Sequence, residues 1–178
     1  MIEVERKYRL DTEKAKDISK WLREITPTST TVHQIDTVYL KGIKSFKQFL
    51  PGMGVMRIRT EGGASKLTYK KAINQSGDSI EHELTISSAE IMQNILQEDD
   101  YRVVTQVTKD RLEVQTKEVT YALDYVENLG WFLEIEIIIA DTTTLNHAEK
   151  IIKLAAAKLS LSDDMIEQKK YDQLLTTK

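Results

Sequence analysis

The chain has 178 residues, of which 40% are hydrophobic and 30% charged, with a formal net charge of −3 and a pI of about 5.7. This balance is typical of a globular chain long enough to bury a sizeable core, and we expect one domain over residues 1–178. It gives no global basic field, so nucleic-acid binding is not expected. The absence of cysteine excludes disulfides and thiolate chemistry, and the three histidines have no zinc-ligand spacing. No apolar run approaches the ~18 residues of a membrane span and no signal peptide is evident, so we expect a cytoplasmic protein.

Hydrophobic periodicity and turn residues divide the chain into strands and a few helices. In chain order, we first expect a strand over 1–9, a helix over 12–25, a β-rich run over 31–40 and a loop over 41–54. Three strands over 55–60, 65–71 and 79–86 follow, and then a short helix over 88–97. The chain ends with strands over 102–114, 119–126 and 132–140, a helix over 146–159 and a last helical stretch from 163. Because strands and helices do not alternate as in βαβ units, the strands are expected to pair antiparallel.

Read with a period of two, these strands carry charged residues on one face and apolar residues on the other. The in-phase cations are Lys7, Arg9, Arg57, Arg59, Lys66, Lys70, Lys109 and Arg111. The in-phase anions are Glu3, Glu5, Glu81, Glu83, Glu113, Asp124, Glu134 and Glu136.

Like charges recur two residues apart on the same strand face. Carboxylates do so at Glu3 and Glu5, and arginines do so at Arg57 and Arg59. Such neighbours repel, and a face that only meets water usually mixes its signs. Carboxylate pairs suit a hard divalent cation such as Mg²⁺ or Mn²⁺, whereas Arg and Lys pairs suit a polyphosphate.

Two architectures are compatible with this charged face. An open antiparallel sheet would cover its apolar side with helices and leave its charged side in water. Eight strands also suffice to close a small barrel, in which case the charged face lines a tunnel. The segregation of like charges favours the barrel, an α+β fold whose eight antiparallel strands form a closed or nearly closed tunnel with helices packed outside.

The ordered set of motifs resembles the CYTH superfamily of triphosphate tunnel metalloenzymes. The resemblance begins at the pattern Glu-x-Glu-x-Lys of residues 3–7 and continues in order through the charged pairs named above to the C-terminal Lys-Tyr of residues 170–171. The superfamily includes class IV adenylyl cyclases and thiamine, inorganic and RNA triphosphatases. The resemblance implies an eight-stranded antiparallel tunnel that binds a small-molecule triphosphate and requires Mg²⁺ or Mn²⁺.

The resemblance also implies roles for individual residues. The metal positions correspond to Glu3, Glu5, Glu134 and Glu136, with Asp124 as a further ligand or as a residue that orients the ligands. The phosphate positions correspond to Lys7, Arg57, Arg59, Lys70, Lys109 and Arg111, with Lys170 as a candidate for a C-terminal family lysine. We expect Arg9, which has the same strand phase, to bind substrate as well. Residues of direct catalytic importance would be Glu3, Glu5, Lys7 and Glu136.

Some positions are left open at this stage. Glu81 and Glu83 would either support the metal or balance the charge of the arginines. Lys169 competes with Lys170 for one family position, and Ser79 and Ile80 occupy a stretch in which many relatives have an arginine. Tyr39 and the loop 41–54 are candidates for the tunnel mouth.

Three functions follow as hypotheses. The first is metal-dependent hydrolysis of an inorganic or organic triphosphate, and the second is class IV adenylyl cyclase activity, which makes cyclic AMP and pyrophosphate from ATP. The third is binding of a polyphosphate or nucleotide without turnover.

Overall fold

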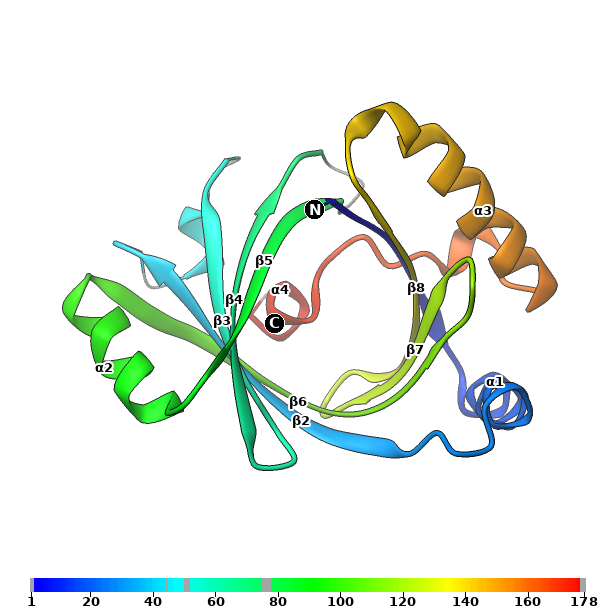
Figure 1. The fold of residues 1–178 in the computed structure, drawn as a ribbon, viewed down its shortest axis with the longest axis horizontal. Helices are drawn as coiled ribbons and strands as arrows, with labels where there is room; N and C mark the ends of the chain where they lie inside the picture. The colour runs from blue at the N-terminus through cyan, green and yellow to red at the C-terminus, as the bar shows by residue number, and fades with distance from the viewer. Residues whose placement is uncertain (1, 44, 50–51, 75–77, 177–178) are drawn as a thin grey trace.

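Eight antiparallel strands close into a barrel in a computed structural model that describes residues 2–43, 45–49, 52–74 and 78–176 (Figure 1). Residue 1 of the first predicted strand and residues 44, 50 and 51 of the predicted loop lie outside the described residues. The strands follow the order β1-β5-β4-β3-β2-β6-β7-β8 around the barrel. Their bounds are β1 (Ile2–Leu10), β2 (Thr31–Lys41), β3 (Gly54–Glu61), β4 (Ala64–Ala72), β5 (Ser79–Ile86), β6 (Tyr101–Gln115), β7 (Thr120–Val126) and β8 (Gly130–Ile139). The predicted closed barrel is confirmed.

Four α-helices lie in the described part of the chain. They are α1 (Thr12–Ile25), α2 (Ala89–Glu98), α3 (Leu145–Lys158) and α4 (Tyr171–Thr176), and single 3₁₀ turns occur at η1 (Phe46–Gln48), η2 (Thr142–Thr144) and η3 (Asp163–Met165). The side chain of Asp11 accepts a hydrogen bond from the Lys14 N–H at 2.7 Å, which satisfies a free donor at the start of α1. Ser88 does the same for Ile91 at the start of α2. None of the helices described is both long and apolar enough to cross a bilayer.

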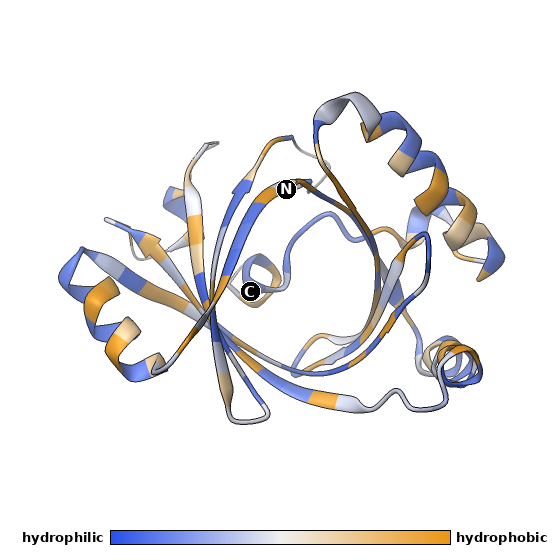
Figure 2. Ribbon diagram, in the orientation of Figure 1, coloured by the Kyte–Doolittle hydropathy of each residue, from blue (hydrophilic) through white to orange (hydrophobic). Residues whose placement is uncertain are grey.

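The apolar faces of the strands form the core against the helices outside the barrel. The largest cluster joins Ile18 and Leu22 of α1 and Ile152 of α3 to Leu133 and Ile135 of β8. Figure 1 shows α1 and α3 on the β7–β8 side of the barrel and α2 on the opposite side, and Figure 2 shows hydrophilic and hydrophobic segments along the barrel strands. The outward side chains are therefore covered where the strands are most apolar.

A smaller cluster lies under α2, where Leu96 meets Tyr39, Ile58 and Leu67. Tyr39 is only 1% exposed and belongs to this outer core. The expectation that Tyr39 borders the tunnel mouth is therefore wrong, because its side chain points to the helix-covered face of β2.

Strand register determines which charged residues become neighbours. On β1 and β8, Glu5 is paired with Glu136 and Lys7 with Glu134. On β3 and β4, Arg59 is paired with Lys66. The barrel thus collects carboxylates along β1 and β8 and cations along β3 and β4.

One glycine position is fixed by close packing. A Cβ added at Gly54 would lie 2.2 Å from Cε2 of Tyr69, so the ring of Tyr69 occupies the space that a side chain would need. We expect Gly54→Ala to lower the free energy of unfolding by about 1–3 kcal/mol, the usual cost of overpacking. In a Tyr69→Ala background the same substitution should cost little, and urea denaturation of the four proteins measures the difference. An equal cost of Gly54→Ala in both backgrounds would contradict this account.

Candidate active site in the barrel

The barrel encloses a charged cavity of about 710 Å³, called the barrel cavity below. Its lining comes from alternate residues of the strands, from the segment that joins β2 to β3, and from the C-terminal residues 168–173. All the in-phase charged residues predicted from the sequence line it, except Arg9 and Asp124. Closure of the barrel therefore brings together charges from segments far apart in the chain.

One side of the barrel cavity is acidic. We call Glu3, Glu5, Glu134 and Glu136 the acidic wall, since all four lie on the adjacent strands β1 and β8. Three of them are paired with cations from other elements. The Lys70 Nζ lies 3.0 Å from Glu3 Oε2, the Lys170 Nζ donates to Glu5 Oε1, and Nη2 of Arg111 lies 2.6 Å from Glu134 Oε2.

Glu136 is the exception in the acidic wall. It has no hydrogen bond or ion pair with any of the residues described. Burial, together with the charges of Glu3, Glu134 and Glu5, raises the pKa of Glu136 from its ordinary value of 4.5 to about 8. Ionising all four carboxylates of the acidic wall would therefore leave negative charge that the described cations do not balance.

This excess is what a divalent cation would neutralise. The acidic wall offers only carboxylate oxygens, the donors that Mg²⁺ and Mn²⁺ prefer. Over the described ranges, no three acidic or histidine side chains lie close enough together to hold an ion in this ion-paired arrangement. The chemistry of the donors and the raised pKa of Glu136 fit a hard cation, provided that the carboxylates exchange their lysine and arginine partners for it.

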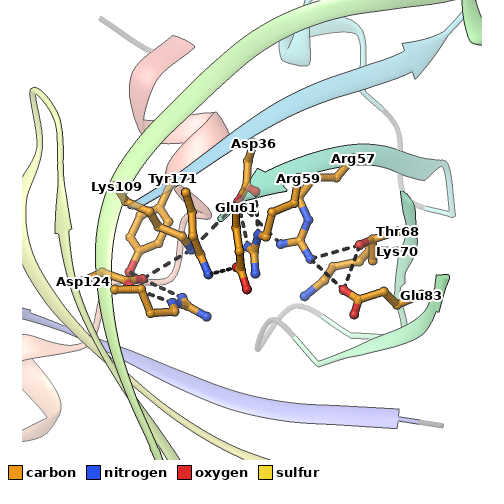
Figure 3. A network of polar contacts seen from close by, with 12 residues as sticks. Asp36, Arg57, Arg59, Glu61, Thr68, Lys70, Glu83, Lys109, Asp124 and Tyr171 are labelled. Atoms are coloured by element: carbon orange, nitrogen blue, oxygen red, sulfur yellow. Dashed lines mark hydrogen bonds and ion pairs between the residues drawn. The ribbon is translucent and has the colours of Figure 1, made fainter. Parts of the chain in front are cut away.

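The opposite side of the barrel cavity is basic. We call Arg57, Arg59, Lys66 and Lys70, on β3 and β4, the basic wall. Arg59 makes a two-pronged contact with Asp36, with Nε 2.7 Å from Oδ1 and Nη2 2.8 Å from Oδ2 (Figure 3). Burial opposes the ionisation of Asp36, but the guanidinium groups of Arg57 and Arg59 outweigh it and hold its pKa well below its usual range. Asp36 thus fixes the orientation of Arg59.

Arg57 is held more loosely than Arg59. Its Nη2 lies 3.2 Å from Thr68 Oγ1 and 3.5 Å from Glu81 Oε1, and its buried Nε has no hydrogen-bond partner among the described residues. A buried donor without a partner is costly. Arg57 is therefore well placed to accept an anionic ligand in the barrel cavity.

The acidic pair on β5 lies among these cations. Glu81 Oε2 is 2.6 Å from the Lys70 Nζ, and Glu83 Oε1 is 2.9 Å from the Lys66 Nζ. Burial opposes the ionisation of both carboxyls, but these lysines contribute to a lowered pKa for each. Of the two roles left open by the sequence, the geometry favours charge balance for the basic wall.

Asp124 does not reach the barrel cavity. It is fully buried behind Arg111, which donates to it from Nε at 2.7 Å and from Nη2 at 2.6 Å. The hydroxyl of Tyr171 also donates to it at 3.0 Å. A carboxylate enclosed by these donors has no free face for an ion, so the predicted role of Asp124 as a metal ligand is revised. The group that Asp124 orients directly is Arg111, which in turn contacts Glu134 of the acidic wall.

Lys109 shares this buried network. Its Nζ lies 3.5 Å from Asp124 Oδ2 and over the ring of Tyr171, 5.3 Å from the centroid. Burial, assisted by the neighbouring Arg111, lowers the pKa of Lys109 from 10.5 to about 8. The charged form of Lys109 is therefore destabilised, and a further anion in the barrel cavity would stabilise it.

Arg9 lies outside the barrel cavity. Its side chain is 46% exposed, with Nη2 3.2 Å from Glu167 and Nη1 3.2 Å from the carbonyl oxygen of Leu129. Its predicted contact with substrate is therefore revised. Arg9 has the correct strand phase, but it lies near the end of β1, beyond the cavity lining.

The structure distinguishes the two C-terminal lysines. Lys170 lines the barrel cavity and contacts Glu5, whereas Lys169 is exposed and absent from the lining. Lys7 also lines it, with its Nζ 4.4 Å from the centroid of the Tyr171 ring and 3.9 Å from Glu134 Oε1. Burial lowers the pKa of Lys7 despite the nearby carboxylates.

Sequence reasoning missed several residues of the lining. Asp36 was overlooked although a strict period-two reading of residues 31–40 places it on the same face as Gln34 and Val38. The loop 41–54 was a candidate for the tunnel mouth, but Phe46 and Phe49 within it were not singled out because this segment has no strand periodicity. Tyr171 was treated only as a part of the C-terminal motif.

The raised pKa of Glu136 predicts how the metal-free protein responds to pH. The folded protein keeps a proton on Glu136 at pH values where the unfolded chain has lost it, so stability falls as pH rises from about 4.5 to 8. In a buffer that contains a chelator, the free energy of unfolding of Glu136→Gln should exceed that of the wild type by on the order of a few kcal/mol at pH 8. The difference should shrink towards pH 4.5. Urea denaturation across this range measures both.

The control is Glu113→Gln, which removes a carboxylate that is 55% exposed and lines the same cavity. Its stability curve should run parallel to that of the wild type. If the stability curve of Glu136→Gln is also parallel to that of the wild type, the pKa of Glu136 is not raised in the folded protein and the account of the acidic wall is wrong.

Comparison with known proteins agrees with this geometry. Residues 1–171 match the family model described as "CYTH domain". A protein of Methanocaldococcus jannaschii named "Putative adenylate cyclase MJ0240" is 30% identical over 177 residues, which cover 98% of each chain. The PH1819 protein of Pyrococcus horikoshii OT3 is 26% identical, with a TM-score of 0.80 over 97% of each chain.

A third protein shares the fold at lower identity. "Putative adenylyl cyclase HpAC1" from Hippeastrum, described as having a dominant triphosphatase activity, gives a TM-score of 0.63 at 14% identity over 98% of this chain and 93% of that chain. With a family match over residues 1–171 and a charged cavity inside a closed eight-stranded barrel, this chain belongs to the CYTH domain family.

Proposed function

We propose that the chain is a divalent-metal-dependent triphosphatase that hydrolyses a phosphoanhydride bond of a triphosphate bound in the barrel cavity. The observation that carries the proposal is the separation of charge across one cavity, with the acidic wall on β1 and β8 facing the basic wall on β3 and β4. A triphosphate with bound divalent cations has the same separation, since its oxygens attract both guanidinium groups and metal ions.

On the basic side, arginines and lysines would bind the phosphate oxygens. Arg59 and Arg111 are held in fixed orientations by Asp36 and Asp124, so they would present their remaining N–H groups without further ordering. Arg57 would contribute its loosely held guanidinium group. The other phosphate contacts are assigned to Lys7, Lys70, Lys109 and Lys170.

On the acidic side, Glu3, Glu5, Glu134 and Glu136 would hold Mg²⁺ or Mn²⁺. The bound ions would neutralise charge on the phosphate oxygens and lower the pKa of a water. Lys70 and Lys170, which contact Glu3 and Glu5 in this structure, would then turn to the phosphate. The same lysines thereby keep the carboxylates paired until the ligands arrive.

Binding without turnover explains the acidic wall less well. A site that binds only an anion gains nothing from four carboxylates, because each of them repels the ligand. The carboxylates acquire a use only when they hold cations, and cations next to a phosphoanhydride favour its cleavage.

Class IV adenylyl cyclase activity is the second candidate. It is favoured by the 30% identity with the Methanocaldococcus jannaschii protein, whose name describes it as an adenylate cyclase. Cyclisation differs from hydrolysis in the nucleophile, which is the ribose 3′-hydroxyl acting on the α-phosphorus instead of water. The contacts with metal and phosphate would be shared by both reactions.

Product analysis distinguishes the two reactions. Purified protein is incubated with tripolyphosphate or with ATP, in Mg²⁺ and in Mn²⁺, and orthophosphate, pyrophosphate and cyclic AMP are measured. We expect orthophosphate from a triphosphate substrate without cyclic AMP. Equimolar cyclic AMP and pyrophosphate from ATP would replace the first proposal with the second.

The same assay includes two variants. Glu5→Gln should reduce turnover by at least a hundredfold while the protein stays folded, because a neutral amide is a poor ligand for a hard cation. Glu118→Gln removes an exposed carboxylate in the β6–β7 turn and should match the wild type. Wild-type turnover by Glu5→Gln would contradict the assignment of the acidic wall.

A further inference from the structure

The inward face of the barrel becomes apolar towards one part of the barrel cavity. On β3, Val55 precedes the in-phase Arg57, and on β4, Ala72 follows the in-phase Lys70. On β2, Val38 follows Asp36, and Met53 lies just before β3. All four apolar residues line the same cavity as the acidic and basic walls, so the cavity has a region that cannot serve phosphate or metal.

Two phenylalanines extend this region. Phe46 and Phe49 lie on and next to η1, and their ring centroids are 5.6 Å apart with an interplanar angle of 59°. Both line the barrel cavity and both are only half-buried. Neither belongs to any of the hydrophobic clusters that hold the described part of the fold together. Aromatic side chains that contribute to no core and face a cavity are available to a ligand.

A polar group without a partner lies on the same lining. Ser79 is 4% exposed, and its buried Oγ has no hydrogen-bond partner among the described residues. On its two sides, Ser79 is paired with Ala72 of β4 and with Glu3 of β1. A buried hydroxyl left without a hydrogen bond is costly, and a hydroxyl or ether oxygen of a ligand would satisfy it.

We propose that Phe46 and Phe49 determine specificity in this chain: they select a triphosphate whose non-phosphate end carries a flat aromatic ring, which packs against them. This inference rests on the proposed function, since it assumes that the charged part of the cavity binds the triphosphate. Inorganic tripolyphosphate would leave the apolar region and the Ser79 hydroxyl unused. Stacking on phenylalanine suits any planar heterocycle, so these residues select for a ring and not for one particular base.

The test compares kcat/KM for ATP, as the aromatic probe, with kcat/KM for tripolyphosphate in the same Mg²⁺ buffer. The wild type should prefer ATP. The double variant F46A/F49A should lower kcat/KM for ATP by about tenfold or more while tripolyphosphate stays within about twofold, because only the ring contact is lost. Lys47→Ala, at an exposed position on the same turn, should change neither value.

The outcomes separate this inference from the proposed function. A preference for tripolyphosphate that F46A/F49A leaves unchanged would overturn the ring contact and keep the triphosphatase. An equal fall for both substrates would show that the phenylalanines only support the cavity, and melting temperatures would report any loss of folding.

If the wild type turns over neither substrate, the proposed function fails. Calorimetric binding of a non-hydrolysable ATP analogue and of tripolyphosphate to the same proteins then decides the ring contact alone. The contact is supported if F46A/F49A binds the ATP analogue more weakly than the wild type does but binds tripolyphosphate equally well, while Lys47→Ala binds both as the wild type does. It is overturned if F46A/F49A binds both ligands as tightly as the wild type.

Discussion

Closure of the antiparallel sheet is the constraint on which the site depends. Once β1 pairs with both β5 and β8, every inward side chain shares a confined interior with the others, and a charge there costs several kcal/mol unless it is paired. Arg59 is therefore paired with Asp36, and Arg111 with Asp124. Among the residues that the structure describes, Glu136 is left without a partner, and its pKa rises to about 8.

The interior ion pairs are of two kinds. Asp36 and Asp124 are almost fully buried and hold guanidinium groups in position, and of the two only Asp36 also lines the cavity. The pairs Lys70–Glu3 and Lys170–Glu5 lie on the cavity lining, where both members can reach a ligand. Under the proposed function, the buried pairs preserve the geometry of the site. The lysines of the other two pairs would leave their carboxylates and bind phosphate, and the carboxylates would bind metal. A barrel with only buried pairs would be rigid but unable to bind.

Much of the fold and part of the site were predictable from the sequence, because a strand alternates its faces with a strict period of two. That period gives the face of a residue but neither its depth along the barrel nor its neighbour on the next strand. Arg9 had the predicted phase, yet it lies beyond the cavity lining. Asp124 also had the predicted phase, but its register opposite Arg111 encloses it. Phe46 and Phe49 come from a segment with no period, so the sequence made their loop a candidate for the tunnel mouth but did not single out these two rings.

The most direct test of the central claim, that one cavity binds metal and triphosphate together, is the melting temperature in a two-by-two design with and without Mg²⁺ and tripolyphosphate. A ligand that binds only the folded state stabilises it by about 2.7 kcal/mol at a hundred times its dissociation constant. The joint shift should exceed the sum of the single-ligand shifts in the wild type, and this excess should disappear in Glu5→Gln, which controls for the complex that the two ligands form in solution. Shifts that simply add in both proteins, or no shift at millimolar concentrations of both ligands, would contradict the claim.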